Sequence, residues 1–223
     1  MRTEGQFYRA EEMTDIYANV CPAFIQAFAG EPWYEVSQCA DLVLPQRCQR
    51  GYSSQEVGQC CETCEQRITE PAYNEPELRQ EFEEHARDYP TVWYVEELES
   101  GIALGGFASL HENASTLIES TYSRNGTTMS SQLDQVVGGG VAWLHELFAD
   151  TNIRASGNLR NFGGMCIGFA EQFSVDRFAF CSINPKMIKV ARREFGSKVQ
   201  VMEGSKDIPD YRHLVVVDLI DLV

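Results

Sequence analysis

The sequence predicts a mixed α/β (α+β) fold with one mixed, mostly antiparallel sheet and helices on both faces. Strand-like and amphipathic helix-like segments alternate along the chain without an internal repeat. The 223 residues are 43% hydrophobic, which is enough to build a core and excludes wholesale disorder. Length and spacing support one domain, residues 1–223, with a small cysteine-rich subdomain inserted at 36–70.

The N-terminal part of the chain predicts one strand and two helices. Gln6–Arg9 is a short candidate strand, and Glu11–Ala29 carries apolar residues at helical spacing. Pro22 lies inside this helical segment and predicts a kink or a split. A second helix is expected over Glu75–Arg87.

A hairpin is expected next. Thr91–Glu96 and Ile102–Leu110 are typical strand segments, joined by an acidic turn that contains Gly101. Gly105 and Gly106 lie inside the second strand and indicate a bulge or a close backbone approach.

The C-terminal half alternates strands and helices after a polar excursion over Asn113–Gly140. Pro185 fits the first turn of a helix, where its missing N–H is not needed. The expected elements are a strand over Val141–Asp150, a helix over Asn158–Phe173, a strand over Arg177–Ser182, a helix over Pro185–Glu194, and strands over Val199–Met202 and Leu214–Ile220.

Charge and composition exclude several function classes. The formal net charge of −15 argues against nucleic acid as a partner, because phosphate backbones require a basic face. No window approaches 18 consecutive apolar residues, so no membrane span is expected, and the N-terminus lacks a signal-peptide core. We therefore expect a cytoplasmic protein with reduced cysteines. The acidity either keeps the protein soluble or suits a cationic substrate.

Five of the eight cysteines fall within 36–70, a segment too poor in apolar residues to build its own core. Their spacing C-x8-C-x12-C-x2-C ends in a knuckle typical of zinc sites, and four thiolates make a closed structural site for Zn²⁺. Cys60 competes for the third position, and metal-free thiols are the alternative. The candidate ligands are Cys39, Cys48, Cys61 and Cys64.

The stretch Val141–Leu159 is the candidate cofactor site. An apolar strand ends at Asp150, a turn with Arg154 and Gly157 follows, and a helix is expected to begin next. Backbone N–H groups converge at a helix N-terminus, and the helix dipole adds roughly half a positive charge there. The residues predict a turn that binds the pyrophosphate of a nucleotide-type cofactor.

The motifs in and around this stretch share one register. The strand carries Glu146-Leu147-Phe148-Ala149, and Arg154, eight residues past Glu146, opens the sequence RASGNL. Downstream, Ser182 and Asn184 precede the next helix, and upstream AFAGEPWYE ends the first helix. Together these motifs resemble the GNAT superfamily of acyl-CoA-dependent N-acetyltransferases, with its Glu-Leu-x-Val strand and Arg/Gln-x-x-Gly-x-Gly/Ala signature. The resemblance covers the chain except 36–70 and 113–140.

The resemblance implies acetyl-CoA as cosubstrate. Two positions depart from the family pattern, because Leu159 stands where Gly or Ala is usual and Ala191 where a catalytic Tyr is frequent. A GNAT-fold module that binds acyl-CoA with weak or no turnover therefore stays open as the alternative. The implied cofactor-binding residues are Leu147, Phe148, Ala149, Arg154, Ala155, Ser156, Gly157, Asn158, Leu159 and Asn184.

Acetyl transfer to an amine needs a base for the ammonium group and a proton donor for the leaving thiolate. Glu146 is the candidate base, acting directly or through water, and the alternative is a Glu that points to solvent or pairs with an Arg. Strand alternation predicts that its neighbour His145 lies on the opposite face. Tyr8, Tyr211 and Cys181 are the candidate donors.

By analogy with the family, Trp33, Tyr34 and Glu35 form an aromatic and acidic wall for the amine, or Trp33 simply caps the core. The resemblance thus implies an N-acetyltransferase that acts on a small-molecule or peptide amine, as a monomer or homodimer. A zinc-ribbon interaction protein whose acidic surface docks a basic partner is a third hypothesis.

Overall fold

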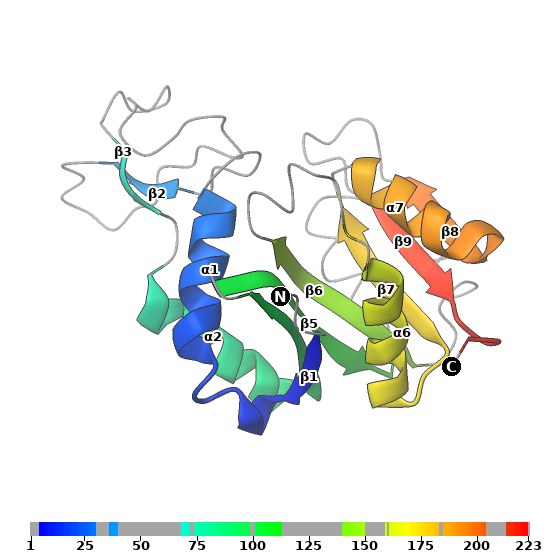
Figure 1. The fold of residues 1–223 in the computed structure, drawn as a ribbon, viewed down its shortest axis with the longest axis horizontal. Helices are drawn as coiled ribbons and strands as arrows, with labels where there is room; N and C mark the ends of the chain where they lie inside the picture. Colours follow the sequence, from blue (N-terminus) through cyan, green and yellow to red (C-terminus); the bar gives the residue numbers. More distant parts are fainter. Residues whose placement is uncertain are drawn as a thin grey trace.

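The structure is a computed structural model, shown in Figure 1. None of the helices that it describes is long and apolar enough to cross a membrane. The described residues are 5–29, 36–39, 68–71, 74–98, 101–112, 140–149, 159, 161–182, 185–203 and 213–222.

Seven strands form one sheet in the order β1-β4-β5-β6-β7-β9-β8. Every neighbouring pair is antiparallel except β6 and β7, which run parallel, so the expected mixed sheet is confirmed. The strands are β1 (Gln6–Arg9), β4 (Thr91–Leu98), β5 (Gly101–His111), β6 (Val141–Ala149), β7 (Arg177–Ser182), β8 (Val199–Glu203) and β9 (His213–Asp218).

Helices cover both faces of the sheet, as Figure 1 shows. Helices α1 (Tyr17–Ala29) and α2 (Glu75–Asp88) pack on one face, which we call the α1/α2 face. Helices α6 (Phe162–Phe173) and α7 (Pro185–Phe195) pack on the other, the α6/α7 face. The chain therefore has two cores separated by the sheet.

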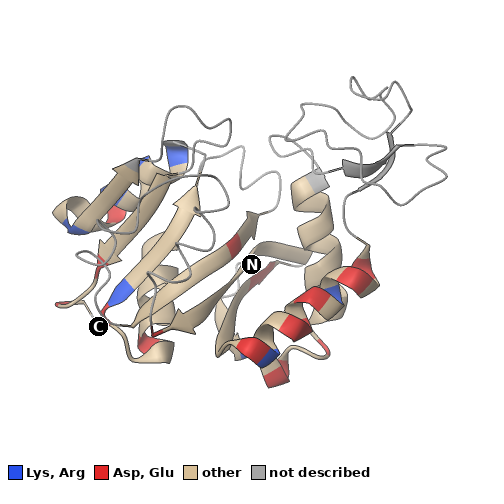
Figure 2. Cartoon of the chain, turned by 180° about the vertical axis from the view of Figure 1, so that it is seen from behind, with Lys and Arg blue, Asp and Glu red and all other residues tan. Residues whose placement is uncertain are grey.

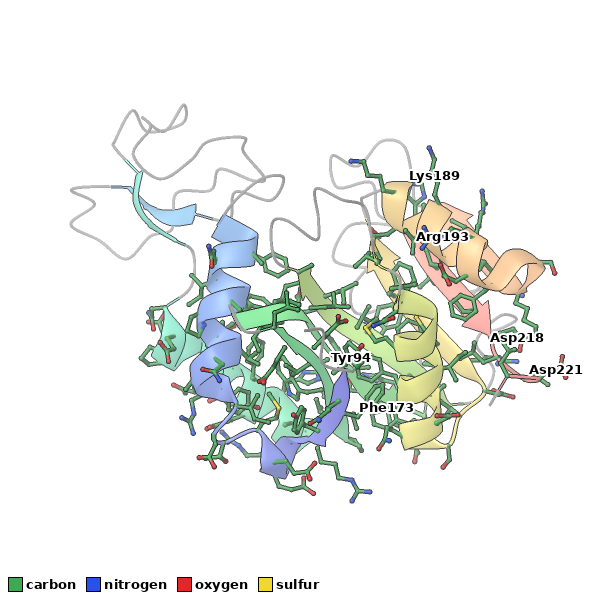
Figure 3. The ribbon with its side chains drawn as sticks, viewed as in Figure 1. Tyr94, Phe173, Lys189, Arg193, Asp218 and Asp221 are labelled. Carbon is green, nitrogen blue, oxygen red and sulfur yellow. The ribbon has the colours of Figure 1, made fainter. Side chains whose placement is uncertain are left out.

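Side-chain alternation along β4 shows how one strand serves both cores. Trp93 and Val95 join the core on the α1/α2 face, whereas Val92 and Tyr94 join the core on the α6/α7 face. The ring of Tyr94, labelled in Figure 3, lies 5.1 Å from the ring of Phe7. A strand buried on both sides needs apolar residues at consecutive positions, which explains the sequence TVWYV.

The first helix is shorter than expected. A separate 3-10 turn, η1, occupies Ala10–Glu12, and α1 begins only at Tyr17. The backbone N–H of Arg9 donates to the Glu12 carboxylate at 2.7 Å, which closes η1 as a capped unit ahead of the helix. The exposed Pro22 lies inside α1 and does not split it.

Helix α6 begins at Phe162, four residues later than expected. The Phe162 N–H donates to the carbonyl of Leu159 at 3.1 Å, which forms a turn at the start of the helix. Asn161, with φ −96° and ψ 7°, occupies the N-cap position. The apolar pattern of the sequence did not separate this turn from the helix that follows.

A second, two-stranded sheet pairs the two ends of the cysteine-rich segment. Strand β2 (Val36–Cys39) runs antiparallel to β3 (Ile68–Pro71), with Val36 opposite Pro71 and Cys39 opposite Ile68. The residues that flank 40–67 are thus paired with each other.

Gly105 and Gly106 mark a close approach rather than a bulge of their own. A Cβ atom on Gly105 would overlap the ring of Phe148, its partner across the β5–β6 pair. A Cβ atom on Gly106 would lie 2.7 Å from the backbone oxygen of Glu146. The close approach expected from the sequence is thus confirmed, and it brings β5 tightly against the candidate site.

Candidate active site

The parallel strands β6 and β7 separate partway along their length. Their register ends where Leu144 pairs with Phe180, although β6 continues to Ala149 and β7 to Ser182. The edge of β6 from His145 onward is thus not paired with β7 in the described part of the chain. Such an opening presents backbone N–H and C=O groups to an extended ligand.

Strand β6 carries a bulge at the same point. In the β5–β6 pair, Ala108 stands opposite Leu144 and Phe107 opposite Glu146, which leaves His145 as an extra residue. A bulge bends its strand and increases the local twist. It therefore accounts for the divergence of β6 from β7.

The bulge also places His145 and Glu146 on one face. Directly paired residues project to the same side, and Phe107 belongs to the core on the α1/α2 face, so Glu146 projects toward that face. The His145 ring stacks on Phe107 at 5.2 Å with planes 9° apart. The prediction that His145 and Glu146 lie on opposite faces is wrong, because it assumed uninterrupted alternation.

The rest of β6 is anchored by its side chains. Leu147 and Ala149 pack on the α6/α7 face, whereas Phe148 packs on the α1/α2 face against Phe24, with ring centroids 5.5 Å apart. Glu146 is half-buried between these anchors. Because these three apolar side chains are held in the cores, the groups available to a ligand at these residues are the backbone N–H and C=O groups.

Three histidines converge on one serine beside Glu146. Their Nε2 atoms lie 2.5 Å (His145), 2.8 Å (His111) and 3.3 Å (His85) from the hydroxyl oxygen of Ser109. Ser109 is fully buried, and the ring of Tyr89 covers His85 and His111 at 5.1 and 4.7 Å. Among the described His, Cys, Asp and Glu side chains no group is arranged to hold a metal ion, so this cluster is a hydrogen-bond network.

All three histidines of this network favour the neutral form. Burial, followed by the neighbouring His85 and His111, lowers the pKa of His145 to about 2. Burial and His85 lower the pKa of His111 to about 4. Burial lowers the pKa of His85 as well, against an opposing effect of Asp88. The network is therefore uncharged near neutral pH.

The sequence reasoning missed this network because its members come from three elements. The signal available was the polar alternation of Ser109 and His111 on an otherwise apolar strand, together with His85 in the last turn of an amphipathic helix.

The first turn of α6 lies directly after the predicted pyrophosphate turn. Asn161 does not cap the helix with its side chain, and its Nδ2 atom instead donates to the buried Glu96 carboxylate of β4 at 3.2 Å. The first turn contains no acidic residue. Gly163 is buried, while Gly164 is exposed with nothing within 4 Å of a Cβ placed there. The sequence reasoning missed Glu96 and the two glycines.

The side chain of Leu159 packs against a core. It is half-buried and packs against the core on the α6/α7 face. Ala191, at the position of the frequent catalytic Tyr, is fully buried in the same core. Residue 191 is therefore a core position in this chain.

The three candidate proton donors lie in different places. Tyr8 is on β1, three strands away from β6, or about 14 Å at the usual strand spacing, and its hydroxyl donates to Gln6 at 2.6 Å. Cys181 follows the last paired residue of β7, so it flanks the opening. Alternation along β7 from Phe180, which packs on the α6/α7 face, places it on the α1/α2 face, the face of Glu146. Tyr211 lies outside the described residues.

Several other predicted site residues also lie outside the described ranges. They are Trp33, Tyr34 and Glu35 of the substrate wall, Arg154, Ala155, Ser156, Gly157, Asn158 and Asn184 of the cofactor site, and the zinc ligands Cys48, Cys61 and Cys64, while only the backbone of Cys39 is described.

Charge is distributed unevenly over the helices. Figure 2 shows acidic residues along α2, where Glu75, Glu77, Glu81, Glu83, Glu84 and Asp88 are exposed. Helix α7 is basic, and its exposed Lys189 and Arg193 are labelled in Figure 3. The two helices lie on opposite faces of the sheet.

Comparison with known proteins shows the fold class. No family model and no curated protein sequence matches the chain. An agmatine N-acetyltransferase variant of known structure is 9% identical, with a TM-score of 0.50 over 96% of this chain and 98% of that one. A ribosomal L7/L12 α-N-protein acetyltransferase in complex with coenzyme A is 14% identical, with a TM-score of 0.49 over 96% and 93%. A putative GNAT-family acetyltransferase from Desulfovibrio desulfuricans is 10% identical, with a TM-score of 0.48 over 97% and 99%. At these identities the likeness is one of fold: the chain shares the mixed α/β fold of the agmatine N-acetyltransferase.

Proposed function

We propose that the chain is an acetyl-CoA-dependent N-acetyltransferase. The observation that carries the proposal is the opening between β6 and β7, with Glu146 beside it on the bulged strand. The fold shared with N-acetyltransferases of known structure supports it. The sequence motifs around Glu146 and Arg154 support it independently, because they do not depend on the fold.

We infer that acetyl-CoA lies along the opening. Its pantetheine arm forms hydrogen bonds with the backbone of Leu147, Phe148 and Ala149. Its pyrophosphate contacts the turn 154–159 and the first turn of α6. The helix dipole and the absence of acidic residues in that turn favour an anion there. The inward packing of Leu159 supports this arrangement, because a side chain held in the core does not fill the turn. Asn184 contributes from the start of α7.

The residues of the site supply the chemistry as follows. Glu146 removes a proton from the substrate ammonium, and the freed nitrogen attacks the thioester carbonyl carbon. The carbon–sulfur bond breaks, and the leaving thiolate takes a proton from a donor, for which Cys181 is the best placed of the three candidates. Overall the ammonium loses two protons, of which one ends on the CoA thiol and one is released to solvent.

The acceptor is a primary amine of a small molecule or a peptide. Trp33, Tyr34 and Glu35 are the proposed amine wall. The acidic α2 and the net charge of −15 favour a cationic amine through long-range attraction. We place the reaction in the cytoplasm, where the cysteines are expected to be thiols or metal ligands.

We further propose that 36–70 is a small subdomain that Zn²⁺ holds together through Cys39, Cys48, Cys61 and Cys64. The pairing of β2 with β3 supports an insertion with these bounds. Zinc content is measured by mass spectrometry of the intact protein under native conditions. One zinc per chain is expected, and loss of the metal in a Cys61→Ser/Cys64→Ser variant identifies its site.

Binding and turnover test the proposed function separately. Acetyl-CoA at a saturating concentration is expected to raise the melting temperature of the full chain, because a ligand that binds only the native state stabilises it. An amine panel that includes agmatine, spermidine and a short peptide then reports thiol release. No thermal shift would contradict acyl-CoA binding, and a shift without release on any amine would favour a binding module without turnover.

A further inference from the structure

We propose that His145, held by the Ser109 network, is a positioning residue that fixes the bulge in β6 and thereby the placement of Glu146. The inference rests on the proposed function, since it assigns Glu146 the role of base. Ser109, His85 and His111 act through His145 and do not touch the substrate.

Three imidazoles converge on one hydroxyl. Their Nε2 atoms lie 2.5 to 3.3 Å from the oxygen of Ser109, and they come from α2, β5 and β6. A hydroxyl donates one hydrogen bond and accepts two. Two of the histidines must therefore carry a proton on Nε2, and the third must accept the Ser109 proton there.

This network contacts His145, the residue that makes the bulge. The ring of His145 is held by Ser109, by the stacked ring of Phe107 and by the edge of His85, whose centroid lies 4.3 Å away. His145 is the residue that has no partner in β5. Its side chain thus ties the extra residue to three neighbours that the sheet and α2 hold in place.

The bulge sets the face of the sheet toward which Glu146 projects. If His145 were paired regularly with β5 and not held in a bulge, alternation from Leu144 would turn residue 146 toward the α6/α7 face. The backbone oxygen of Glu146 is confined on its other side, because Gly106 approaches it more closely than a residue with a side chain would permit. Holding His145 therefore holds Glu146 toward the α1/α2 face.

Packing alone does not account for the network. Polar groups on a buried face cost free energy unless all are hydrogen-bonded, and apolar side chains of similar size would fill the same space. The neighbouring positions on this face, Phe107, Trp93 and Phe82, are apolar. A polar network at the bulge is thus a local feature that packing does not require.

The test compares Ser109→Ala with Thr91→Val. Thr91 faces Ser109 across the β4–β5 pair, is also buried, and bonds the carbonyl of Tyr89 at 2.9 Å. Both variants remove one hydroxyl group from a buried residue, but Ser109 bonds three histidines, His145 among them, whereas the Thr91 hydroxyl, among the described residues, bonds only the carbonyl of Tyr89. We expect Ser109→Ala to lower kcat at least about tenfold, with KM for acetyl-CoA and the CoA dissociation constant within about twofold of wild type. Thr91→Val is expected to leave kcat within about twofold.

A double-mutant cycle with Glu146→Gln separates positioning from general loss of structure. If Ser109 acts through Glu146, Ser109→Ala lowers the residual rate of Glu146→Gln less than about twofold. Equal fold losses in both backgrounds would overturn the proposal. His145→Gln, which keeps an N–H at the reach of Nε2, is expected to retain more activity than His145→Leu, and equal losses would also count against it.

Two spectroscopic measurements test the proposal without relying on turnover. Nitrogen-15 spectra at pH 7 are expected to show Nε2–H tautomers for two of the three histidines and Nδ1–H for the third. Ser109→Ala, but not Thr91→Val, is expected to change the carbon-13 shift of the Glu146 carboxyl group. An unchanged carbon-13 shift in Ser109→Ala would overturn the positioning role, even if the protein acetylates no amine. If the wild-type protein does not bind acetyl-CoA, only the proposed function is contradicted.

Discussion

Glu146 in β6 stands directly opposite Phe107 in β5, while the ring of His145, its unpaired neighbour, stacks on that same Phe107. One aromatic residue thus orders both side chains of the bulge. This relationship brings a carboxylate and an imidazole to one face beside the opening between β6 and β7. It also links the candidate base to the buried histidine network.

The first prediction concerns the start of α6. Gly164→Asp is expected to stabilise the chain by about 1 kcal/mol, because it removes a helix glycine and adds an acid to the first turn. The same carboxylate is expected to weaken CoA binding about tenfold by repelling the pyrophosphate. Urea unfolding and calorimetric titration with CoA measure the two effects.

Gly164→Ala is the matched control. It is expected to stabilise by about 0.5–1 kcal/mol and to leave the CoA dissociation constant unchanged, since a Cβ atom there meets nothing within 4 Å. Unaltered CoA affinity in Gly164→Asp would show that the pyrophosphate does not lie at this turn.

The second prediction concerns pH and stability. The folded-state pKa is lowered for His85, to about 4 for His111 and to about 2 for His145, so the unfolded chain binds these protons first as pH falls. The free energy of unfolding is therefore greatest above about pH 6.5 and decreases below it, by up to about 1.4 kcal/mol per pH unit for each histidine that stays neutral.

Urea unfolding between pH 5 and pH 8 checks this dependence above the range in which most carboxylates titrate. A His111→Gln variant is expected to show a shallower decrease below pH 6.5, because one group with a lowered pKa is gone. Stability that does not change between pH 8 and pH 5 would contradict a neutral, buried network.

The third prediction concerns Gly105. A Cβ atom there would lie 2.8 Å from Cε1 of Phe148 and closer still to Cζ, and that ring is held against Phe24. Gly105→Ala is therefore expected to destabilise the chain by about 1–3 kcal/mol through overpacking. In a Gly105→Ala/Phe148→Leu double variant the two losses should be less than additive, which thermal unfolding can measure. Additive losses would mean that the ring and the glycine are not in contact.

Much of the sheet was predictable because its strands are locally encoded. The segments VWYV and FAFC are apolar without interruption, as strands buried on both faces are, and β7 has the bounds expected from the sequence. Helix α2 was predictable to within one residue, since Asn74 caps it by accepting from the Glu77 N–H at 3.0 Å.

The geometry around Glu146 was not predictable from local pattern. The residues VAWLHELFA show no break at His145, because the bulge is defined by the register with β5 and not by a turn residue. Likewise, the contact between Asn161 and Glu96 joins positions 65 residues apart. Sequence reasoning found the candidate base, and only the tertiary structure shows what surrounds it.

Thiol release from acetyl-CoA by wild type and Glu146→Gln, in the presence of an amine panel, tests the central claim most directly. Wild type is expected to release thiol only when a suitable amine is present. Glu146→Gln is expected to lower that rate by about 10²- to 10⁴-fold, the usual contribution of a general base, while CoA binding is retained. Equal rates for the two proteins, or a wild-type chain that does not bind acetyl-CoA, would contradict the account.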